Sequence, residues 1–262
     1  MKIGVYQFSS TNSIRNNLET IKKAICLAAG QGVRLVVFHE CALCGYPPIE
    51  QSIDDIHKEE IDAALQRISE LAKQCKIFVA VGTVRFDTEG RFNSIVLFAD
   101  DGTLMGFYDK TALWGWDTDH FIRGTRPGIF EIDNVKVGFR ICFDIRFPES
   151  FRELYKKNTD ICFVSFSDTS ETPLPDRYNI IKSHLITRAV ENVMTVVSVN
   201  STSRFQTAPT AVFDYNGEIE KEAEPNVEGL LVYDFTKPET TFGMKGRLVN
   251  NDYFLQTGSS RK

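Results

Sequence analysis

The stretch Val137-Gly-Phe-Arg-Ile-Cys-Phe-Asp-Ile-Arg-Phe-Pro-Glu149 decides how the second half of this 262-residue chain folds. Its first residues complete an apolar run that is typical of a buried strand. Cys142 follows directly, where the predicted strand ends and the side chain can face a cleft on rigid backbone. We therefore expect a strand over 135–142, a helix over 148–157 and a candidate functional thiol between them.

Apolar strand patterns alternate with helical patterns from one end of the chain to the other. Val33–Phe38 is an apolar run interrupted only by Arg34, which is typical of a strand covered on both faces. The other predicted strands cover 2–8, 77–84, 93–98, 104–108, 161–166, 193–200 and 230–235, with a hairpin over 211–219. The other predicted helices cover 13–29, 61–75 and 178–192.

Each half of the chain has strand–helix–strand units beside a hairpin, which predicts an α/β fold of two similar sheets with helices outside. No linker rich in Pro, Gly and Ser divides the halves, so we expect a single domain over 1–262. Residues 240–262 are rich in Gly, Ser and Asn, and we expect them to form an extended tail.

The composition favours a soluble globular protein without a polyanionic partner. The chain is 42% hydrophobic and 25% charged, its formal net charge is −5, and it has no run of Lys and Arg typical of a nucleic-acid site. The first residues resemble a strand rather than a signal peptide, and no apolar stretch is long enough to span a membrane. Six scattered cysteines are then expected to be reduced, in a cytoplasmic protein.

Three side chains with complementary chemistry follow predicted strands. Glu40 follows the strand that begins at Val33, Lys110 follows the predicted strand over 104–108, and Cys142 ends the predicted strand over 135–142. Each also has an ordinary alternative role. A buried cysteine usually only fills space in the core, a carboxylate at the edge of a sheet is often exposed to solvent, and most lysines lie on the surface. No histidine stands near the thiol in sequence, so a reactive Cys142 needs a carboxylate base and a cation, and burial should raise the pKa of Glu40.

Cys41-Ala-Leu-Cys44, preceded by His39, is a rival site. Such a pair can hold zinc or form a redox couple, but no second pair follows. Leu43 stands where a His-Glu-x-x-His motif requires histidine, so we expect no metal, and the role of the two cysteines stays open. The chain has no nucleotide-binding glycine motif and no Gly-x-Ser-x-Gly turn, so nucleotide binding and serine-hydrolase chemistry lose their main support.

Together these segments resemble the nitrilase superfamily of carbon–nitrogen hydrolases over nearly the whole chain. Glu40 stands before Gly45-Tyr-Pro47, Lys110 follows an aromatic strand, and Cys142 precedes an acidic, arginine-bearing loop. Arg188-Ala-Val-Glu-Asn192 matches a further family segment, a helix that usually packs at a dimer interface. The resemblance implies a four-layer α-β-β-α sandwich of two mixed sheets and a homodimer or higher homo-oligomer.

The resemblance also implies a role for each marker residue. Cys142 would be the nucleophile, and Glu40 would take the thiol proton and deliver it to the leaving amine. Lys110 and the backbone N–H of Phe143 would hold the oxyanion. A thioester would form and be hydrolysed by a water activated by Glu40, without a metal or cofactor.

Three positions depart from the family pattern. Asp117 stands where a second glutamate is common, with Phe121 and Gly124 at the expected offsets. Ala112 and His39 replace a common histidine and a common proline. Because aspartate is one methylene shorter than glutamate, its contact with Lys110 or with substrate is expected to be looser unless a neighbour compensates.

The residues after the nucleophile look most like the small nitrilase-like amidases, including the ω-amidase type. Arg146 suits a substrate carboxylate, or pairs with an internal acid such as Glu149, and the sequence leaves both open. Trp114 belongs to a bulky segment that is expected to line a pocket. The predicted pocket walls are the loops 112–124, 165–178 and 201–209.

The sequence thus predicts a cytoplasmic amidase that cleaves a small-molecule C–N bond through Cys142, Glu40 and Lys110. Ammonia and a carboxylate would be its products. The alternatives are an N-carbamoyl amide hydrolase, which would also release carbon dioxide, and a ligand-binding pseudoenzyme, which the exchange at Asp117 keeps open.

Overall fold

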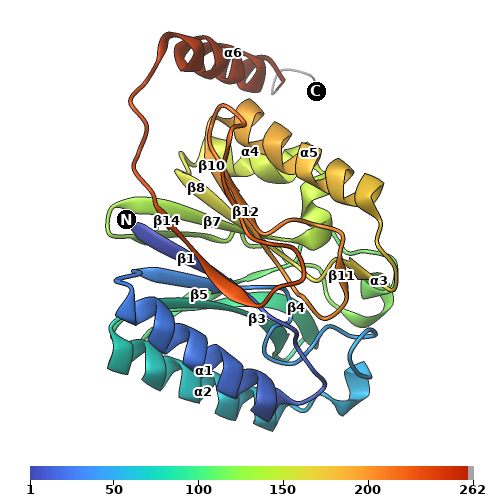
Figure 1. Ribbon diagram of the computed structural model, residues 1–262. Helices are drawn as coiled ribbons and strands as arrows, with labels where there is room; N and C mark the ends of the chain where they lie inside the picture. The colour runs from blue at the N-terminus through green and yellow to red at the C-terminus, as the bar shows by residue number, and fades with distance from the viewer. Residues whose placement is uncertain (259–262) are drawn as a thin grey trace.

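The computed structural model describes residues 1–258 and stacks two six-stranded sheets between outer helices (Figure 1). The first sheet has the strand order β14 (Gly229–Asp234), β1 (Lys2–Gln7), β2 (Leu35–Phe38), β3 (Phe78–Phe86), β4 (Arg91–Phe98) and β5 (Leu104–Asp109). The second has the order β13 (Ile219–Glu222), β12 (Ala211–Phe213), β10 (Thr195–Asn200), β8 (Ile161–Phe166), β7 (Val135–Ile141) and β6 (Ile129–Ile132). A small ribbon pairs β9 (Thr169–Ser170) with β11 (Phe205–Gln206).

Helices cover both outer faces of this pair of sheets (Figure 1). The first sheet is covered by α1 (Ile14–Gly30) and α2 (Lys58–Cys75), and the second by α4 (Pro148–Lys156) and α5 (Pro175–Asn192). Shorter turns are η1 (Ile53–Asp55), α3 (Asp117–His120) and η2 (Cys142–Arg146). The predicted four-layer α-β-β-α architecture is therefore confirmed.

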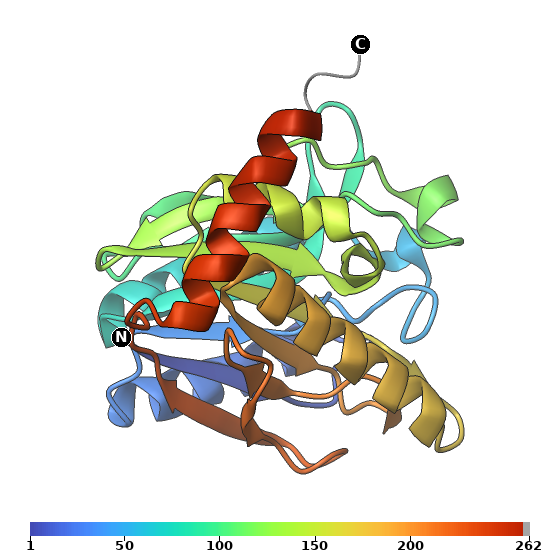
Figure 2. The same ribbon diagram turned by 90° about the horizontal axis from the view of Figure 1, so that it is seen from above.

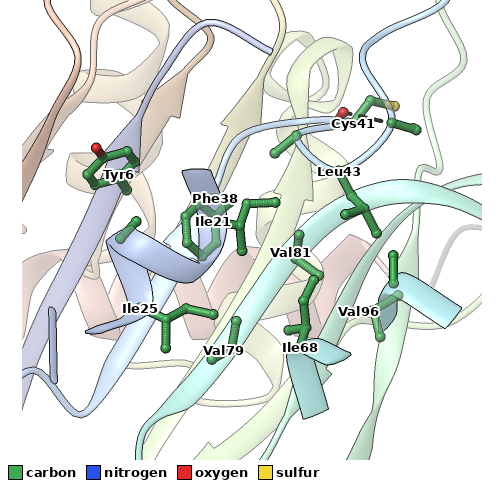
Figure 3. Packing of buried hydrophobic residues seen from close by; sticks show 14 of the residues in the cluster. Tyr6, Ile21, Ile25, Phe38, Cys41, Leu43, Ile68, Val79, Val81 and Val96 are labelled. Carbon is green, nitrogen blue, oxygen red and sulfur yellow. Dashed lines mark hydrogen bonds between the residues drawn. The ribbon is translucent and has the colours of Figure 1, made fainter. Parts of the chain in front are cut away.

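Strand β2 shows how the sequence builds these layers. Val36 and Phe38 pack into the apolar layer between the first sheet and its helices, whereas Leu35 and Val37 pack between the two sheets. Because neighbouring side chains point to opposite faces of a strand, a strand buried on both sides has no polar positions. Figure 3 shows the outer layer, where Phe38 lies close to Ile21 of α1.

Each sheet is mixed, with parallel strands at its centre and antiparallel strands toward its edges. In the first sheet β1, β2 and β3 run parallel, and in the second β7, β8 and β10 do. Parallel neighbours place their carboxyl ends at one edge of a sheet, which is where α/β folds bind ligands. Glu40 follows β2, Cys142 follows β7 and Ser167 follows β8, so the topology gathers these residues.

The expected extended tail over 240–262 is wrong for the described residues, because α6 (Phe242–Gly258) is a helix. This segment contains no proline, and two of its glycines lie in the first turns, where a glycine costs the helix little stability. Side chains anchor it to the body: Tyr155 of α4 donates to Asp252 at 2.8 Å, and Arg247 donates to the Val190 carbonyl at 3.0 Å. Figure 2 shows α6 crossing over α4. Residues 259–262 lie outside the described part.

The other predicted elements are found within a few residues. The prediction did not include β6, the short strands β9 and β11, the 3₁₀ turns η1 and η2, or the four-residue helix α3, which lies in a segment expected to be a loop. None of the helices within residues 1–258 is both long and apolar enough to cross a membrane.

Candidate active site

Glu40 is buried in the turn that follows β2, with only 1% of its surface exposed. Its Oε1 accepts hydrogen bonds from Lys110 Nζ at 2.8 Å and from Asn93 Nδ2 at 2.7 Å. Its Oε2 accepts from the backbone N–H of Ser167 at 2.9 Å. Three donors on three different segments therefore fix this carboxylate and compensate for its burial.

Gly82 in β3 makes room for that turn. A Cβ atom built at this position would lie 2.1 Å from the carbonyl oxygen of His39 and 2.7 Å from the backbone nitrogen of Cys41. The carbonyl of Gly82 also accepts from the N–H of Leu43 at 3.0 Å. The absence of a side chain at Gly82 thus lets β3 hold the backbone on both sides of Glu40.

Lys110 leaves β5 between two carboxylates. Besides Glu40, its Nζ donates to Asp117 Oδ2 at 2.7 Å, and Asp117 has no exposed surface. Asp117 Oδ1 accepts from the Tyr46 hydroxyl at 2.7 Å. Asp117 is the first residue of the helical turn α3, and its carboxylate reaches the ammonium directly although the side chain is shorter than that of glutamate.

Cys142 stands at the junction between β7 and the 3₁₀ turn η2, with φ of 44°. A non-glycine residue in this left-handed region is uncommon and is held there by its surroundings. Asp144 supplies the restraint: its carboxylate accepts from the N–H of Ile141 at 2.9 Å, from the N–H of Ala112 at 2.7 Å and from the Tyr108 hydroxyl at 2.7 Å.

The charges of this cluster determine its resting protonation. Burial raises the pKa of Glu40 as expected, although Lys110 acts in the opposite direction. Burial alone would lower the pKa of Lys110, but Glu40, Cys142 and Asp117 together raise it well above its usual value. Burial and the charge of Glu40 raise the pKa of Cys142 well above its usual value, against the effect of Lys110. The resting sulfur is therefore a thiol, and it needs a base before it can attack.

Cys142 opens onto a cavity of about 230 Å³. Three of the predicted substrate contacts, Trp114, Phe143 and Arg146, line it together with Cys142. The other lining residues are Tyr46, Ile49, Ile145, Ser167, Asp168, Thr169, Arg177 and Ile181. Asp117 is not among them, and its carboxylate contacts Lys110. The loops 112–124 and 165–178 contribute walls as predicted, whereas 201–209 contributes none of these residues.

Arg146 does not pair with the internal acid that the sequence suggested. Its Nη1 lies 3.0 Å from Nε2 of His184 in α5, and no ion pair with Glu149 is formed. Burial and the charges of Arg146 and Arg188 lower the pKa of His184, so this ring is the neutral acceptor. The second arginine of the cavity, Arg177, is already paired through two hydrogen bonds, at 3.0 and 2.9 Å, with Asp168.

The rival motif forms no metal site. Cys41 and Cys44 are buried without exposed surface, and throughout residues 1–258 no three His, Cys, Asp or Glu side chains are grouped so that they could hold a metal ion. The Cys44 thiol donates to the Cys41 carbonyl at 3.8 Å.

The family model for carbon-nitrogen hydrolase matches residues 2–241. The chain belongs to the carbon-nitrogen hydrolase family. Its relatives include the 2-oxoglutaramate amidase of Bacillus subtilis, 32% identical over 58% of each chain. They also include the omega-amidase of Danio rerio, 28% identical over 83% of this chain and 80% of that protein.

Solved structures of the carbon-nitrogen hydrolase fold agree with this assignment. An amidase from Nesterenkonia sp. superposes with a TM-score of 0.84 over 99% of this chain and 96% of that chain, at 22% identity. A double mutant of the Nesterenkonia amidase, described in complex with acrylamide, also superposes with a TM-score of 0.84 at 22% identity. These structures, at 22% identity, confirm the fold. The family model and the amidases among the relatives confirm the predicted family, its amidase branch and the enzyme class, an amidase of carbon–nitrogen bonds other than peptide bonds.

Sequence reasoning missed several residues of this carbon-nitrogen hydrolase site. Tyr46 carried a signal, since it belongs to the Gly-Tyr-Pro segment used as a marker. Asn93 and Ser167 carried no signal that a single sequence reveals, because an asparagine in a hairpin strand and a serine after a strand are common. Asp144 was visible only as an acidic residue close to the cysteine.

Proposed function

We propose that this protein hydrolyses the amide of a small carboxylate-bearing substrate through Cys142, with Glu40 as base and Lys110 as oxyanion donor. One observation carries the proposal: the buried Glu40–Lys110 pair, 2.8 Å from Oε1 to Nζ, acts electrostatically on a cysteine that lines a small cavity. A thiol with a raised pKa beside a desolvated carboxylate suits proton transfer during attack.

Acylation comes first in this mechanism. The Cys142 sulfur attacks the amide carbon while Glu40 takes the thiol proton, and the carbonyl oxygen becomes an oxyanion. Lys110 is held in place by Asp117 and, with the backbone N–H of Phe143, stabilises that charge. Glu40 then gives its proton to the nitrogen, the C–N bond breaks, and ammonia leaves a thioester on Cys142.

Deacylation uses the same groups in reverse order. Glu40 takes a proton from a water that attacks the thioester carbon, and Lys110 again faces the oxyanion. The C–S bond breaks, the carboxylic acid is released, and the proton on Glu40 returns to the Cys142 sulfur. No metal or organic cofactor takes part in these steps, so we expect chelators to leave the rate unchanged.

Arg146 supports a substrate with a second, free carboxylate. It lines the cavity, and one of its amino groups contacts neutral His184, which leaves its charge uncompensated by this neighbour. A guanidinium suits a carboxylate through paired hydrogen bonds. One relative is named 2-oxoglutaramate amidase, after a substrate that carries a carboxylate beside its amide, and another is named omega-amidase. We therefore propose the monoamide of a short dicarboxylic acid as substrate class.

An ammonia-release screen tests this substrate class. Monoamides of dicarboxylic acids are compared with uncharged amides of equal length, on the wild type, on Arg146→Gln and on Arg67→Gln. Arg67 lies exposed on α2 and is the control. We expect Arg146→Gln to raise KM for the carboxylate-bearing amides by about tenfold or more and to leave the uncharged amides unchanged. An equal loss on both classes, or preference for uncharged amides in the wild type, would overturn the assignment.

Product analysis separates the two alternatives. An N-carbamoyl amide hydrolase would release carbon dioxide together with ammonia, whereas the proposed amidase releases ammonia alone. A pseudoenzyme would bind ligand without turnover. The Asp117–Lys110 contact removes the structural reason to expect one, since aspartate reaches the ammonium. The homodimer or higher homo-oligomer and the cytoplasmic location stay predictions, and light scattering tests the first.

A further inference from the structure

Cys41 and Asn93 connect the unexplained cysteine pair to the proposed base. Cys41 follows Glu40 directly, and its Sγ lies 3.7 Å from Asn93 Oδ1 as a hydrogen-bond donor. At its other end the same amide donates from Nδ2 to Glu40 Oε1 at 2.7 Å. Both side chains are buried without exposed surface, and Figure 3 shows Cys41 at the edge of the outer apolar layer near Leu43.

The orientation of this amide matters for the base. With its NH₂ group toward Glu40, Asn93 stabilises the ionised carboxylate; turned around, its carbonyl oxygen would face that carboxylate. The Cys41 thiol is a donor to the carbonyl end, so it favours the first orientation. The backbone carbonyl of Asn93 also accepts from the N–H of Lys110 at 2.8 Å, so one residue touches both partners of the pair.

We propose that Cys41 and Asn93 are positioning residues that hold Glu40 ready to accept the thiol proton, a role that rests on the proposed function. The cysteine orients the amide, and the amide restrains and stabilises the carboxylate. The hydrogen bond from Asn93 also lowers the pKa of Glu40 and thereby opposes the larger effect of burial. Neither residue lines the cavity, and the contact of Asn93 with Glu40 is the route by which they would act on the reaction.

Three cysteine variants test the positioning role. Cys41→Ala removes the donor, Cys41→Ser keeps one of similar size, and Cys162→Ala removes another fully buried cysteine that lies in the layer between the second sheet and its helices. We expect Cys41→Ala to lower kcat by about fivefold with little change in KM. It should also move the acid limb of the pH profile of kcat/KM, where the rate falls because Glu40 becomes protonated, to higher pH. Cys41→Ser should have a kcat and an acid limb close to those of the wild type, and Cys162→Ala should leave the position of the acid limb unchanged.

Asn93→Ala is the stronger form of the same test. It removes a hydrogen bond to a charged group, so we expect a loss in kcat of about tenfold or more and a larger shift of the acid limb. An unshifted limb in Cys41→Ala and Asn93→Ala, or an equal shift in Cys162→Ala, would overturn the role. Full activity in Cys142→Ala would instead remove the proposed function itself, so the two failures are distinguishable.

A second, independent observation concerns Cys26 and Cys75, which lie on the outer helices α1 and α2 and do not line the cavity. Their sulfur atoms are 3.9 Å apart although 49 residues separate them, and Cys26 is exposed while Cys75 is half-buried. Cys26 belongs to α1 and Cys75 is the last residue of α2. Two thiols this close, one of them open to solvent, form a dithiol that a small oxidant can reach.

We infer that Cys26 and Cys75 form a reversible disulfide when the protein meets a disulfide oxidant such as oxidised glutathione. The Cys26 sulfur attacks the glutathione disulfide and one glutathione leaves as a thiol. The Cys75 sulfur then attacks the mixed disulfide, the second glutathione leaves, and both protein protons end on the released thiols. The new bond would link α1 to α2 around the segment that carries Glu40.

Peptide mapping after incubation with oxidised glutathione tests this dithiol. We expect a linked pair of peptides containing Cys26 and Cys75, reversal by dithiothreitol, and a higher Tm for the oxidised wild type. Cys26→Ser and Cys75→Ser should show neither the link nor the shift in Tm. A stable glutathione adduct on Cys26 with Cys75 still free, or no reaction at either thiol, would overturn the inference.

Discussion

Lys110 sits between two buried carboxylates, and this arrangement governs the residues around it. Its Nζ contacts Glu40 at 2.8 Å and Asp117 at 2.7 Å, so one ammonium group faces two carboxyl groups. Burial and the charge of Glu40 raise the pKa of Cys142, because ionising it would add negative charge in a desolvated place, and this is why the thiol stays protonated at rest. Attack with proton transfer to Glu40 keeps the total charge constant.

Exchange of Glu40 tests the base. Glu40→Gln keeps the shape and loses the proton acceptor, so we expect kcat to fall by about 100- to 10,000-fold with an intact fold. In the wild type, the raised pKa of Glu40 places the acid limb of kcat/KM above the pH at which an ordinary carboxyl group titrates. Activity should fall as the pH drops through that limb, because protonated Glu40 cannot accept the thiol proton. A pH–rate profile that is flat there would contradict the assignment.

Exchange of Asp117 tests its contact with Lys110. The negative charge of Asp117 contributes to the raised pKa of Glu40, so Asp117→Asn should move the acid limb of kcat/KM to lower pH. It should also destabilise the fold by about 3 kcal/mol, because it removes one partner of a buried pair. Asp119→Asn, at an exposed position of the same helical turn, is the control and should change neither property. An unmoved limb in Asp117→Asn would show that this charge does not reach Glu40.

For single residues, the sequence predicted the identity of the reactive groups but not the side chains that hold them in place. Glu40, Lys110 and Cys142 were found because each follows a strand and carries chemistry. Asn93 could not be found, because its role depends on which strand end meets which turn. The effect of replacing glutamate by Asp117 depends on where α3 starts, which a short turn does not reveal in a single sequence.

The elements that position the site are strand ends followed by tight turns. Gly124, like Gly82, allows a close backbone approach: a Cβ there would lie 2.0 Å from the carbonyl oxygen of Asp109, next to Lys110. Strand and helix periodicity predicted most of these elements, because their apolar patterns extend over many residues. The helix α6 was mistaken for a tail, since its stability comes from anchors such as Arg247 rather than from an apolar stripe.

Gly82→Ala tests the close packing of β3 against the turn of Glu40. The added Cβ would collide with the backbone of His39, so the turn must shift. We expect a loss of stability of about 1–3 kcal/mol, measured by urea unfolding, and a fall in kcat. Gly30→Ala is the control, because nothing lies within 4 Å of the added atom at the end of α1, and it should be neutral or slightly stabilising. Wild-type kcat in Gly82→Ala would show that the turn tolerates displacement.

The two sheets are joined by an apolar layer and by the return of the chain to its start. Strand β14 pairs antiparallel with β1, and the amino group of Met1 donates to the Phe235 carbonyl at 2.7 Å. Phe235 packs between the sheets with residues of both, including Phe139 and Phe163. These connections support the prediction of a single domain, which would unfold in one cooperative transition followed equally by fluorescence and circular dichroism.

Phe235→Ala tests the shared layer. Phe235 is 2% exposed, and truncating it should destabilise the protein by about 3–5 kcal/mol while the transition stays cooperative. Phe242→Ala is the matched control, since Phe242 is 94% exposed and should cost little. Two separate transitions in Phe235→Ala would mean that the sheets fold independently and that the chain is not one domain.

The proposed mechanism requires that Cys142 form a thioester with the substrate, and intact-protein mass spectrometry detects this intermediate. Wild type and Cys142→Ala are mixed with a monoamide of a dicarboxylic acid and quenched in acid within the first turnovers. We expect the wild type to gain the mass of the acyl group and peptide mapping to place it on Cys142. Cys142→Ala should neither gain this mass nor release ammonia. Ammonia release by Cys142→Ala at the wild-type rate, or an acyl group on another residue, would contradict it.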